Sequence, residues 1–178
     1  MMVLFTSHEV LKKTHEYLAH ASALKGRELF AQSITGSKEK ITKRFFRSQG
    51  GILLGAETFW EGIDMPGNAL QIVMVTRLPF EFPNRPLVQA RHARLKKQGL
   101  NPFTVDSLPR TAMRLKQSYG RLLRSHEDKG VFVLMDQRIY TAAYGGYLQK
   151  SFPGNQRLEI LPMEQIKEES VQFLNNQE

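Results

Sequence analysis

The chain has 178 residues, of which 25 are Lys or Arg and 17 are Asp or Glu, so its net charge is +8. A hydrophobic fraction of 41% and a charged fraction of 24% are typical of a globular domain and exclude a disordered or fibrous chain. The absence of cysteine excludes a disulfide, a thiolate nucleophile and a cysteine-bound iron–sulfur cluster in this chain, and we expect a cytoplasmic protein. The longest apolar runs are far shorter than a membrane span, so we expect no contact with a membrane.

Five short apolar runs predict strands at residues 2–6, 28–32, 51–56, 70–76 and 131–135. Between and after them, helical spacing predicts helices over 8–21, 37–48, 87–98 and about 162–176. Uninterrupted apolar strands that alternate with helices predict an α/β fold with a mainly parallel sheet flanked by helices on both faces. Residues 1–178 are predicted to form one domain with a helical insertion at about 80–110. The chain begins directly inside a strand, as expected of a fragment of a longer protein.

Two of the predicted helices have apolar positions that we expect to face a core. In the helix over 37–48 these are Ile41, Phe45 and Phe46. In the C-terminal helix they are Met163, Ile166, Val171 and Leu174.

The positive charge is concentrated in one segment, residues 85–124. This segment has one acid, Asp106, and ten basic residues: Arg85, Arg91, Arg94, Lys96, Lys97, Arg110, Arg114, Lys116, Arg121 and Arg124. Its charge is therefore +9, and the rest of the chain keeps 15 of the 25 basic residues and 16 of the 17 acids. Concentrated positive charge without mixed signs indicates an anionic partner that carries phosphates.

The segment Gln117 to Arg124, QSYGRLLR, carries the strongest pattern for chemistry. On one helix Gln117, Arg121 and Arg124 would share a stripe, with Gly120 between them at a cost of ~1 kcal/mol relative to Ala. Two guanidiniums one turn apart can neutralise the oxygens of a phosphoryl group during its transfer. The alternative interpretation is a solvent-exposed basic stripe.

A second pattern, ETFWEGIDMPG, follows the predicted strand at 51–56. Loops at the carboxyl ends of parallel strands bind ligands, and Asp64 is placed there to accept from a ribose hydroxyl or to orient an arginine. A metal-dependent nuclease cluster of Glu57, Glu61 and Asp64 is an alternative, which the nearby Gly and Pro residues disfavour because they interrupt a regular helix. Trp60 and Phe59 either stack on bases or fill the core, with core packing favoured for at least one.

Several patterns are missing from the sequence. There is no GxxxxGK[ST] phosphate loop, no acidic strand end for magnesium and no metal-binding histidine spacing. We therefore expect no metal site in this chain, and no ATP hydrolysis by this chain alone.

Three segments in register resemble motifs IV, V and VI of a known family: LFTSHEVL (4–11), FWEGIDMPG (59–67) and QSYGRLLRS (117–125). The family is the second RecA-like motor domain of DinG/XPD-type superfamily 2 DNA helicases, and the similarity extends over roughly residues 2–155. The resemblance implies a RecA-like domain, related to the P-loop NTPases but without a phosphate loop. It also implies a 5′ to 3′ DNA helicase in which an upstream lobe, supplied in cis, holds most of the ATP and Mg²⁺. Many members carry an iron–sulfur cluster in that first lobe.

The resemblance assigns roles to individual residues. It makes arginine fingers and γ-phosphate contacts of Gln117, Arg121 and Arg124. It places Gly120, Glu61, Gly62 and Asp64 at the nucleotide, the last three coupling its state to DNA. Single-stranded DNA is expected to contact Thr6 and Ser7 by motif position, and Arg85, Arg91 and Arg94 by charge.

Two other functions stay open. One is a non-hydrolysing nucleic-acid-binding or regulatory domain of a DinG-like protein whose full-length form acts as an exonuclease. The other is a standalone metal-dependent nuclease, which predicts magnesium-dependent cleavage that Asp64→Ala abolishes; we expect no cleavage.

Overall fold

The computed structural model describes residues 1–24, 26–60, 70–122, 128–154 and 159–176. The described strands are β1 (Met2–Phe5), β2 (Leu29–Ala31), β3 (Ile52–Ala56), β4 (Ile72–Val75) and β5 (Val131–Leu134). They coincide with the five predicted runs. Buried parallel strands are apolar on both faces, which is why these runs stand out in the sequence.

The five strands form one parallel sheet in the order β2-β3-β1-β4-β5. The central strand β1 pairs with both β3 and β4, so that Met2 lies opposite Leu53 and Val73. The predicted parallel α/β sheet is confirmed. Because all strands run the same way, their carboxyl ends meet at one edge of the sheet.

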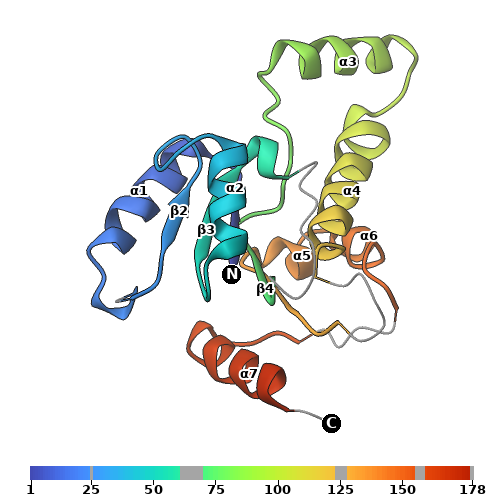
Figure 1. Cartoon of the computed structure of the whole chain (residues 1–178). Helices are drawn as coiled ribbons and strands as arrows, with labels where there is room; N and C mark the ends of the chain where they lie inside the picture. The colour runs from blue at the N-terminus through green and yellow to red at the C-terminus, as the bar shows by residue number, and fades with distance from the viewer. Residues whose placement is uncertain (25, 61–69, 123–127, 155–158, 177–178) are drawn as a thin grey trace.

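Helices cover both faces of the sheet (Figure 1). The helices are α1 (His8–Ala19), α2 (Lys38–Arg47), α3 (Pro86–Lys97), α4 (Leu108–Tyr119), α5 (Arg138–Thr141), α6 (Gly145–Gln149) and α7 (Met163–Asn175). Shorter helical segments are η1 (Ser22–Leu24), η2 (Glu57–Phe59) and the π-helix η4 (Phe103–Ser107). Ser7 and Ser37 begin α1 and α2 as N-caps, each accepting a backbone N–H in the first turn.

The alternation of side chains along the strands creates two cores. Met2 and Leu4 of β1 point to the face where Ile41 and Phe45 of α2 pack, together with Leu115 of α4. Val3 and Phe5 point to the opposite face, where Leu11 of α1 is buried. The expected inward positions of α2 are therefore found, with Phe46 only partly buried.

Helices α3 and α4 form an arm that extends from the body, with α3 at its outer end (Figure 1). Val88 is the one buried residue of α3. Among the described residues, no helix combines the length and the apolar composition that crossing a bilayer requires.

The prediction for the apolar side of α7 is wrong at two positions. Met163 is 57% exposed and Val171 is 50% exposed, while Ile166 and Leu174 are partly buried. The helix packs against β5 through few residues, and none of its side chains is fully buried. An amphipathic pattern identifies a helix, but it does not specify what the apolar side contacts.

Candidate functional site

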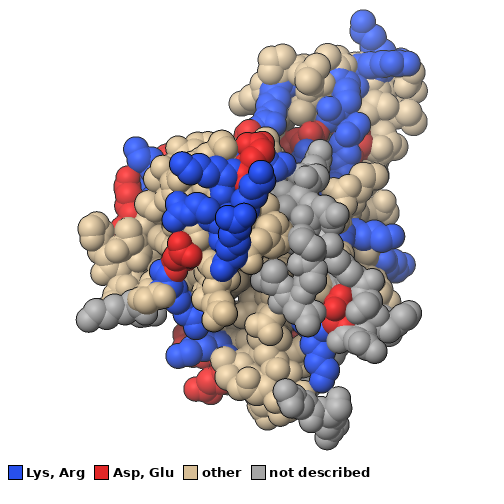
Figure 2. Space-filling view, in the orientation of Figure 1, with Lys and Arg blue, Asp and Glu red and all other residues tan. Residues whose placement is uncertain are grey.

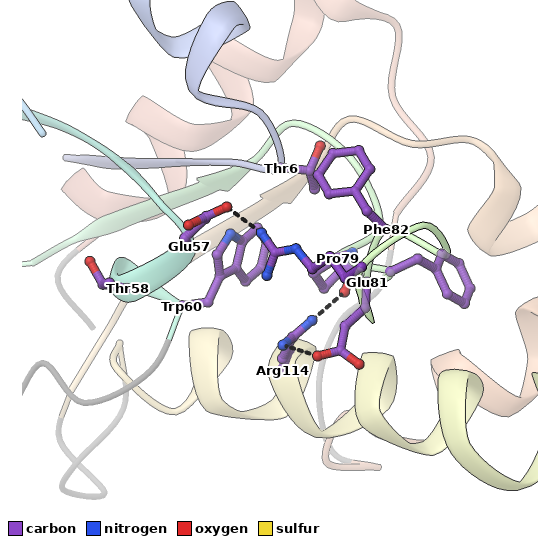
Figure 3. Close-up of a pocket in the computed structure, with 10 residues that line it drawn as sticks. Thr6, Glu57, Thr58, Trp60, Pro79, Glu81, Phe82 and Arg114 are labelled. Atoms are coloured by element: carbon purple, nitrogen blue, oxygen red, sulfur yellow. Dashed lines mark hydrogen bonds and ion pairs between the residues drawn. The ribbon is translucent and has the colours of Figure 1, made fainter. Parts of the chain in front are cut away.

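A pocket of about 300 Å³ lies where the strands end (Figure 3). It is lined by Thr6 after β1, by Glu57, Thr58 and Trp60 after β3, by Pro79, Phe80, Glu81 and Phe82 after β4, and by Arg85 and Arg114 of the arm. Residues from separate parts of the chain therefore meet at the sheet edge where parallel α/β proteins bind their ligands.

Glu57 stands at the start of the loop after β3 with a φ of +37°, which a side-chain-bearing residue rarely adopts. Its carboxylate forms an ion pair with Arg85 at the start of α3, and its Oε2 lies 3.8 Å from Nε2 of His8. Such backbone strain persists where surrounding contacts hold it and is concentrated at functional sites. The strained backbone of Glu57 therefore supports a functional role for this pocket.

The segment after β4 is fixed by arginines of the arm. Arg114 donates to the carbonyl oxygen of Pro79 at 3.2 Å and to Oε1 of Glu81 at 3.0 Å (Figure 3). Arg91 pairs with the other carboxylate oxygen of Glu81. Burial on its own raises the pKa of Glu81, but the hydrogen bonds and charges of Arg91 and Arg114 outweigh it and leave the pKa below its usual value. Glu81 is therefore ionised and paired at neutral pH.

Asp106 joins α3 to α4 in the same way. It accepts from Nε of Arg91 at 3.2 Å and from Nε of Arg110 at 2.6 Å, and Nε2 of His92 lies 3.2 Å from its Oδ2. Burial acts to raise the pKa of Asp106, but the hydrogen bonds and charges of Arg110 and Arg91 outweigh it and leave the pKa below its usual value. This carboxylate fastens the two helices of the arm to each other.

The charge count along the sequence overestimated the free positive charge of residues 85–124. Arg85, Arg91, Arg110 and Arg114 all have acid partners, and two of these acids, Glu57 and Glu81, lie outside the counted segment. Of the three arginines expected at DNA by charge, Arg85 and Arg91 are thus paired, and Arg94 is exposed on α3. Within residues 85–122, the exposed cations without an acid partner among the described residues are Arg94, Lys96, Lys97 and Lys116.

Asp136 holds the strand-end loops together from the other side. Its carboxylate accepts the Leu78 N–H at 2.9 Å and the guanidinium of Arg138, whose Nη2 lies 2.6 Å away. Burial acts to raise the pKa of Asp136, but the bonds from Arg138 and from the backbone lower it to about 2. Through Leu78, this pair positions the segment that lines the pocket.

Arg121 is the described basic residue with the most unusual surroundings. Its side chain is buried, with 8% exposed, and its Nη1 lies 3.5 Å from Sδ of Met2. No acid partner for it exists among the described residues, and burial lowers its pKa to about 10. A buried cation without a counter-charge is costly to the fold.

The predicted single helix through 117–124 is wrong. Helix α4 ends at Tyr119, and Gly120 is its C-cap, with its N–H donating to the Lys116 carbonyl oxygen at 2.8 Å. Gly120 is therefore at a helix end, a common place for glycine, and not in a helix interior. Gln117 is exposed on the last turn while Arg121 is buried beyond the cap, so the two do not form one stripe.

Four other candidate residues, Glu61, Gly62, Asp64 and Arg124, lie outside the described residues. Thr6 lines the pocket, whereas the hydroxyl of Ser7 accepts from the Val10 N–H at 3.5 Å as the cap of α1. Their roles at DNA stay predictions. In the described parts of the chain, no three His, Asp or Glu side chains are grouped to hold a metal ion.

Phe59 and Trp60 both belong to the core. Phe59 is fully buried, and the Trp60 Nε1–H donates to the Phe5 carbonyl oxygen at 2.8 Å. The exposed aromatic residue of the pocket is Phe82, which is 50% exposed and contacts the Arg85 guanidinium. Phe82 was not among the predicted site residues, because its only signal in the sequence is its place in a proline-rich connection.

The chain is similar in sequence to a protein family and to individual known proteins. The family described as helicase C-terminal domain matches residues 1–155. A Bacillus subtilis protein named 3′-5′ exonuclease DinG is 47% identical over 154 residues, which cover 86% of this chain and 16% of that protein. A Haemophilus influenzae protein named ATP-dependent DNA helicase YoaA is 34% identical over 174 residues, covering 98% of this chain and 26% of its own length. The chain thus spans at most about a quarter of these two relatives.

Solved structures share the fold. A structure named XPD helicase superimposes with a TM-score of 0.59 and 19% identity over 84% of this chain and 27% of that chain. The Xpd4 protein of S. tokodaii gives a TM-score of 0.55 and 20% identity over 84% of this chain and 28% of its own. At these identities the likeness concerns the α/β RecA-like fold alone.

Proposed function

Because the chain belongs to the helicase C-terminal domain family, of the DinG/XPD type, we propose that it is the second motor lobe of an ATP-dependent DNA helicase. In this proposal an upstream lobe of the same protein binds most of the ATP and Mg²⁺. This lobe supplies arginines to the phosphates and holds single-stranded DNA, along which the motor moves 5′ to 3′.

The observation that carries the proposal is the buried guanidinium of Arg121. Folding places this charge where water is largely excluded, without a described acid to balance it. An anion that reaches it from outside removes that penalty and gains an interaction stronger than one at an exposed arginine. A phosphoryl group held by a second lobe is such an anion, and an arginine in this role accelerates phosphoryl transfer by ~10³ or more.

The pocket at the strand ends supports the second half of the proposal, a grip on DNA. It combines an exposed aromatic ring, Phe82, with the hydroxyl of Thr6 and with Arg85 and Arg114, whose charges Glu57 and Glu81 balance in this lobe. The exposed ring carries the argument, because single-strand binders stack bases on aromatic side chains. The size of the pocket, about 300 Å³, suits one base and its sugar better than a duplex.

DNA-stimulated ATP hydrolysis is the test of the motor proposal. We expect no hydrolysis by this chain alone, and hydrolysis when the upstream lobe of the same protein is added together with single-stranded DNA. Arg121→Ala and Arg124→Ala are each expected to reduce the rate by ~10³ or more, because each removes a contact to the transferred phosphoryl group. Hydrolysis that is indifferent to both arginines would contradict the proposal.

Phe82→Ala tests the grip on DNA. Loss of one stacking ring is expected to weaken single-strand binding by ~1–3 kcal/mol, or about 5- to 150-fold in Kd, as measured by fluorescence anisotropy with an oligo-dT probe. The matched control is Tyr17→Ala, because Tyr17 is an exposed ring on α1 away from the pocket. Equal affinities of both variants would remove Phe82 from the DNA site.

A second candidate function follows from the relative that is named an exonuclease. In such a protein this domain would bind nucleic acid and regulate cleavage by another domain without hydrolysing ATP. The same experiment separates the two functions, since a regulatory domain gives DNA binding that depends on Phe82 but no hydrolysis that depends on Arg121.

A further inference from the structure

Helix α2 carries a second concentration of positive charge, which the count along the sequence did not reveal. Its ten residues include five cations, Lys38, Lys40, Lys43, Arg44 and Arg47, and one acid, Glu39, so the helix has a charge of +4. Helix α7 has three acids and one lysine, so its charge of −2 offsets part of this excess in the total. Figure 2 shows Lys and Arg side chains gathered over the exposed side of α2.

Three of these cations form no ion pair among the described residues. They are Lys40, Lys43 and Arg47, all exposed; the charge of Lys43 acts on Glu39 only from a distance, whereas Arg44 pairs with Glu28 at 3.2 Å. They recur at spacings of three and four residues, so they form one stripe along the helix. Like charges at these spacings repel each other and destabilise an isolated helix.

The helix dipole adds to this positive potential. Lys38 and Lys40 lie in the first turn of α2, where the aligned peptide groups already present partial positive charge and favour anions. Glu39 is engaged locally, because its own backbone N–H and Ser37 lower its pKa by hydrogen bonding. By contrast, Arg94, Lys96 and Lys97 of α3 lie in the last turn, where the dipole favours cations. Lys38 and Lys40 are thus arranged against the local field, whereas Arg44 and Arg47 in the last turn of α2 are arranged with it, as are the cations of α3.

The stripe continues from the pocket. Lys38 donates to the carbonyl oxygen of Thr58 at 2.8 Å, and Thr58 lines the pocket. From Lys40 to Arg47 the helix rises ~10 Å. Successive phosphates of a strand lie about 3.4 Å apart along the axis of a duplex and farther apart in an extended single strand, so three cations spread over ~10 Å can each contact one phosphate.

We propose that the exposed stripe of α2, formed by Lys40, Lys43 and Arg47, binds the sugar–phosphate backbone of the single strand as it leaves the pocket at the strand ends. The proposal rests on the proposed DNA grip and extends it to a surface that none of the three helicase motifs contains. The stripe contributes through charge, with no requirement for a particular base.

The test compares the 178-residue chain with a Lys40→Gln, Lys43→Gln, Arg47→Gln variant in oligo-dT binding over a series of salt concentrations. Each neutralised phosphate contributes ~0.7 to the slope of log K against log salt, so the variant should lose about 2 from the slope. The matched control is Lys12→Gln, Lys13→Gln, Lys167→Gln, which removes three exposed charges from α1 and α7. This control should keep the wild-type slope.

Strand length provides a second readout. A strand of about four nucleotides places one base in the pocket and leaves most of the stripe uncovered, so the α2 variant should bind it almost as the wild type does; a strand of about 16 nucleotides should show the full deficit. A wild-type slope in the α2 variant, with the slope lost instead in an Arg94→Gln, Lys96→Gln, Lys97→Gln variant, would overturn the inference and leave the proposed function intact. Absence of single-strand binding by the wild-type chain would overturn both.

Discussion

Replacement of Arg121 by Met is expected to make the chain more stable while it abolishes DNA-stimulated ATP hydrolysis in the two-lobe protein. Burial lowers the Arg121 pKa from 12.5 to about 10, which corresponds to a cost of ~3 kcal/mol for keeping the folded state charged at neutral pH. Met has a similar length and no charge, so the variant should recover up to ~3 kcal/mol in the free energy of unfolding, measured by urea denaturation. Hydrolysis should fall by ~10³ or more.

The same substitution at Arg114 is the control. Arg114 lies on α4 and donates to Pro79 and Glu81, so Arg114→Met leaves a carboxylate and a carbonyl oxygen without these donors and should destabilise the chain by ~1–3 kcal/mol. If the free energy of unfolding rises in Arg121→Met and falls in Arg114→Met, then Arg121 serves to bind a ligand and Arg114 serves to stabilise the fold. Destabilisation by Arg121→Met, or hydrolysis that survives it, would contradict the role proposed for Arg121.

Asp136→Asn is expected to lower the free energy of unfolding by ~2 kcal/mol at neutral pH. The folded-state pKa of Asp136 is lowered from 3.8 to about 2, so the ionised carboxylate stabilises the fold by ~2 kcal/mol. An asparagine still accepts the Leu78 N–H but no longer balances the charge of Arg138. Because Leu78 leads into the pocket-lining segment, the affinity for oligo-dT should fall as well.

The stabilisation by the ionised Asp136 carboxylate should depend on pH. A lowered carboxyl pKa stabilises the fold fully above about pH 4, and this contribution is lost as the pH falls through about 2. The difference in stability between wild type and Asp136→Asn should therefore shrink over that window. Glu16→Gln, which removes an exposed partner of Lys12, should leave both stability and its pH dependence almost unchanged. A difference that is constant with pH would show that Asp136 acts without its charge.

The sheet could be predicted from the sequence because its residues are determined by local composition. The run from Ile52 to Ala56 contains no polar side chain and every residue of it is buried, as expected of a parallel strand that is covered on both faces. The edge at which loops bind ligands then follows from the parallel arrangement. Because Phe5 pairs with Ala56 at the ends of β1 and β3, a parallel sheet predicts that Thr6 and Glu57 lie at the same edge.

The ion pairs and the helix end at the candidate site could not be predicted from the sequence. Glu57 and Glu81 neutralise arginines that follow them by 28 and 10 residues, and no count within a window includes such pairs. Helical spacing continued through Gly120, although the chain leaves the helix there and turns Arg121 inward. Periodicity describes which residues share a face while the helix lasts, and it does not say where tertiary contacts end the helix.

Within this lobe, strand β1 connects the surroundings of Arg121 with the pocket at the strand ends. Its first residue, Met2, contacts the buried guanidinium of Arg121, and the residue after its last, Thr6, lines the pocket. Four residue steps separate them, ~13 Å of extended chain that is hydrogen-bonded on both sides by β3 and β4. In the proposed motor, a phosphate that draws Arg121 away from Met2 would act on one end of β1, and the other end borders the pocket proposed for DNA. No loop lies between the two ends, so β1 would pass a movement of Arg121 directly to that pocket.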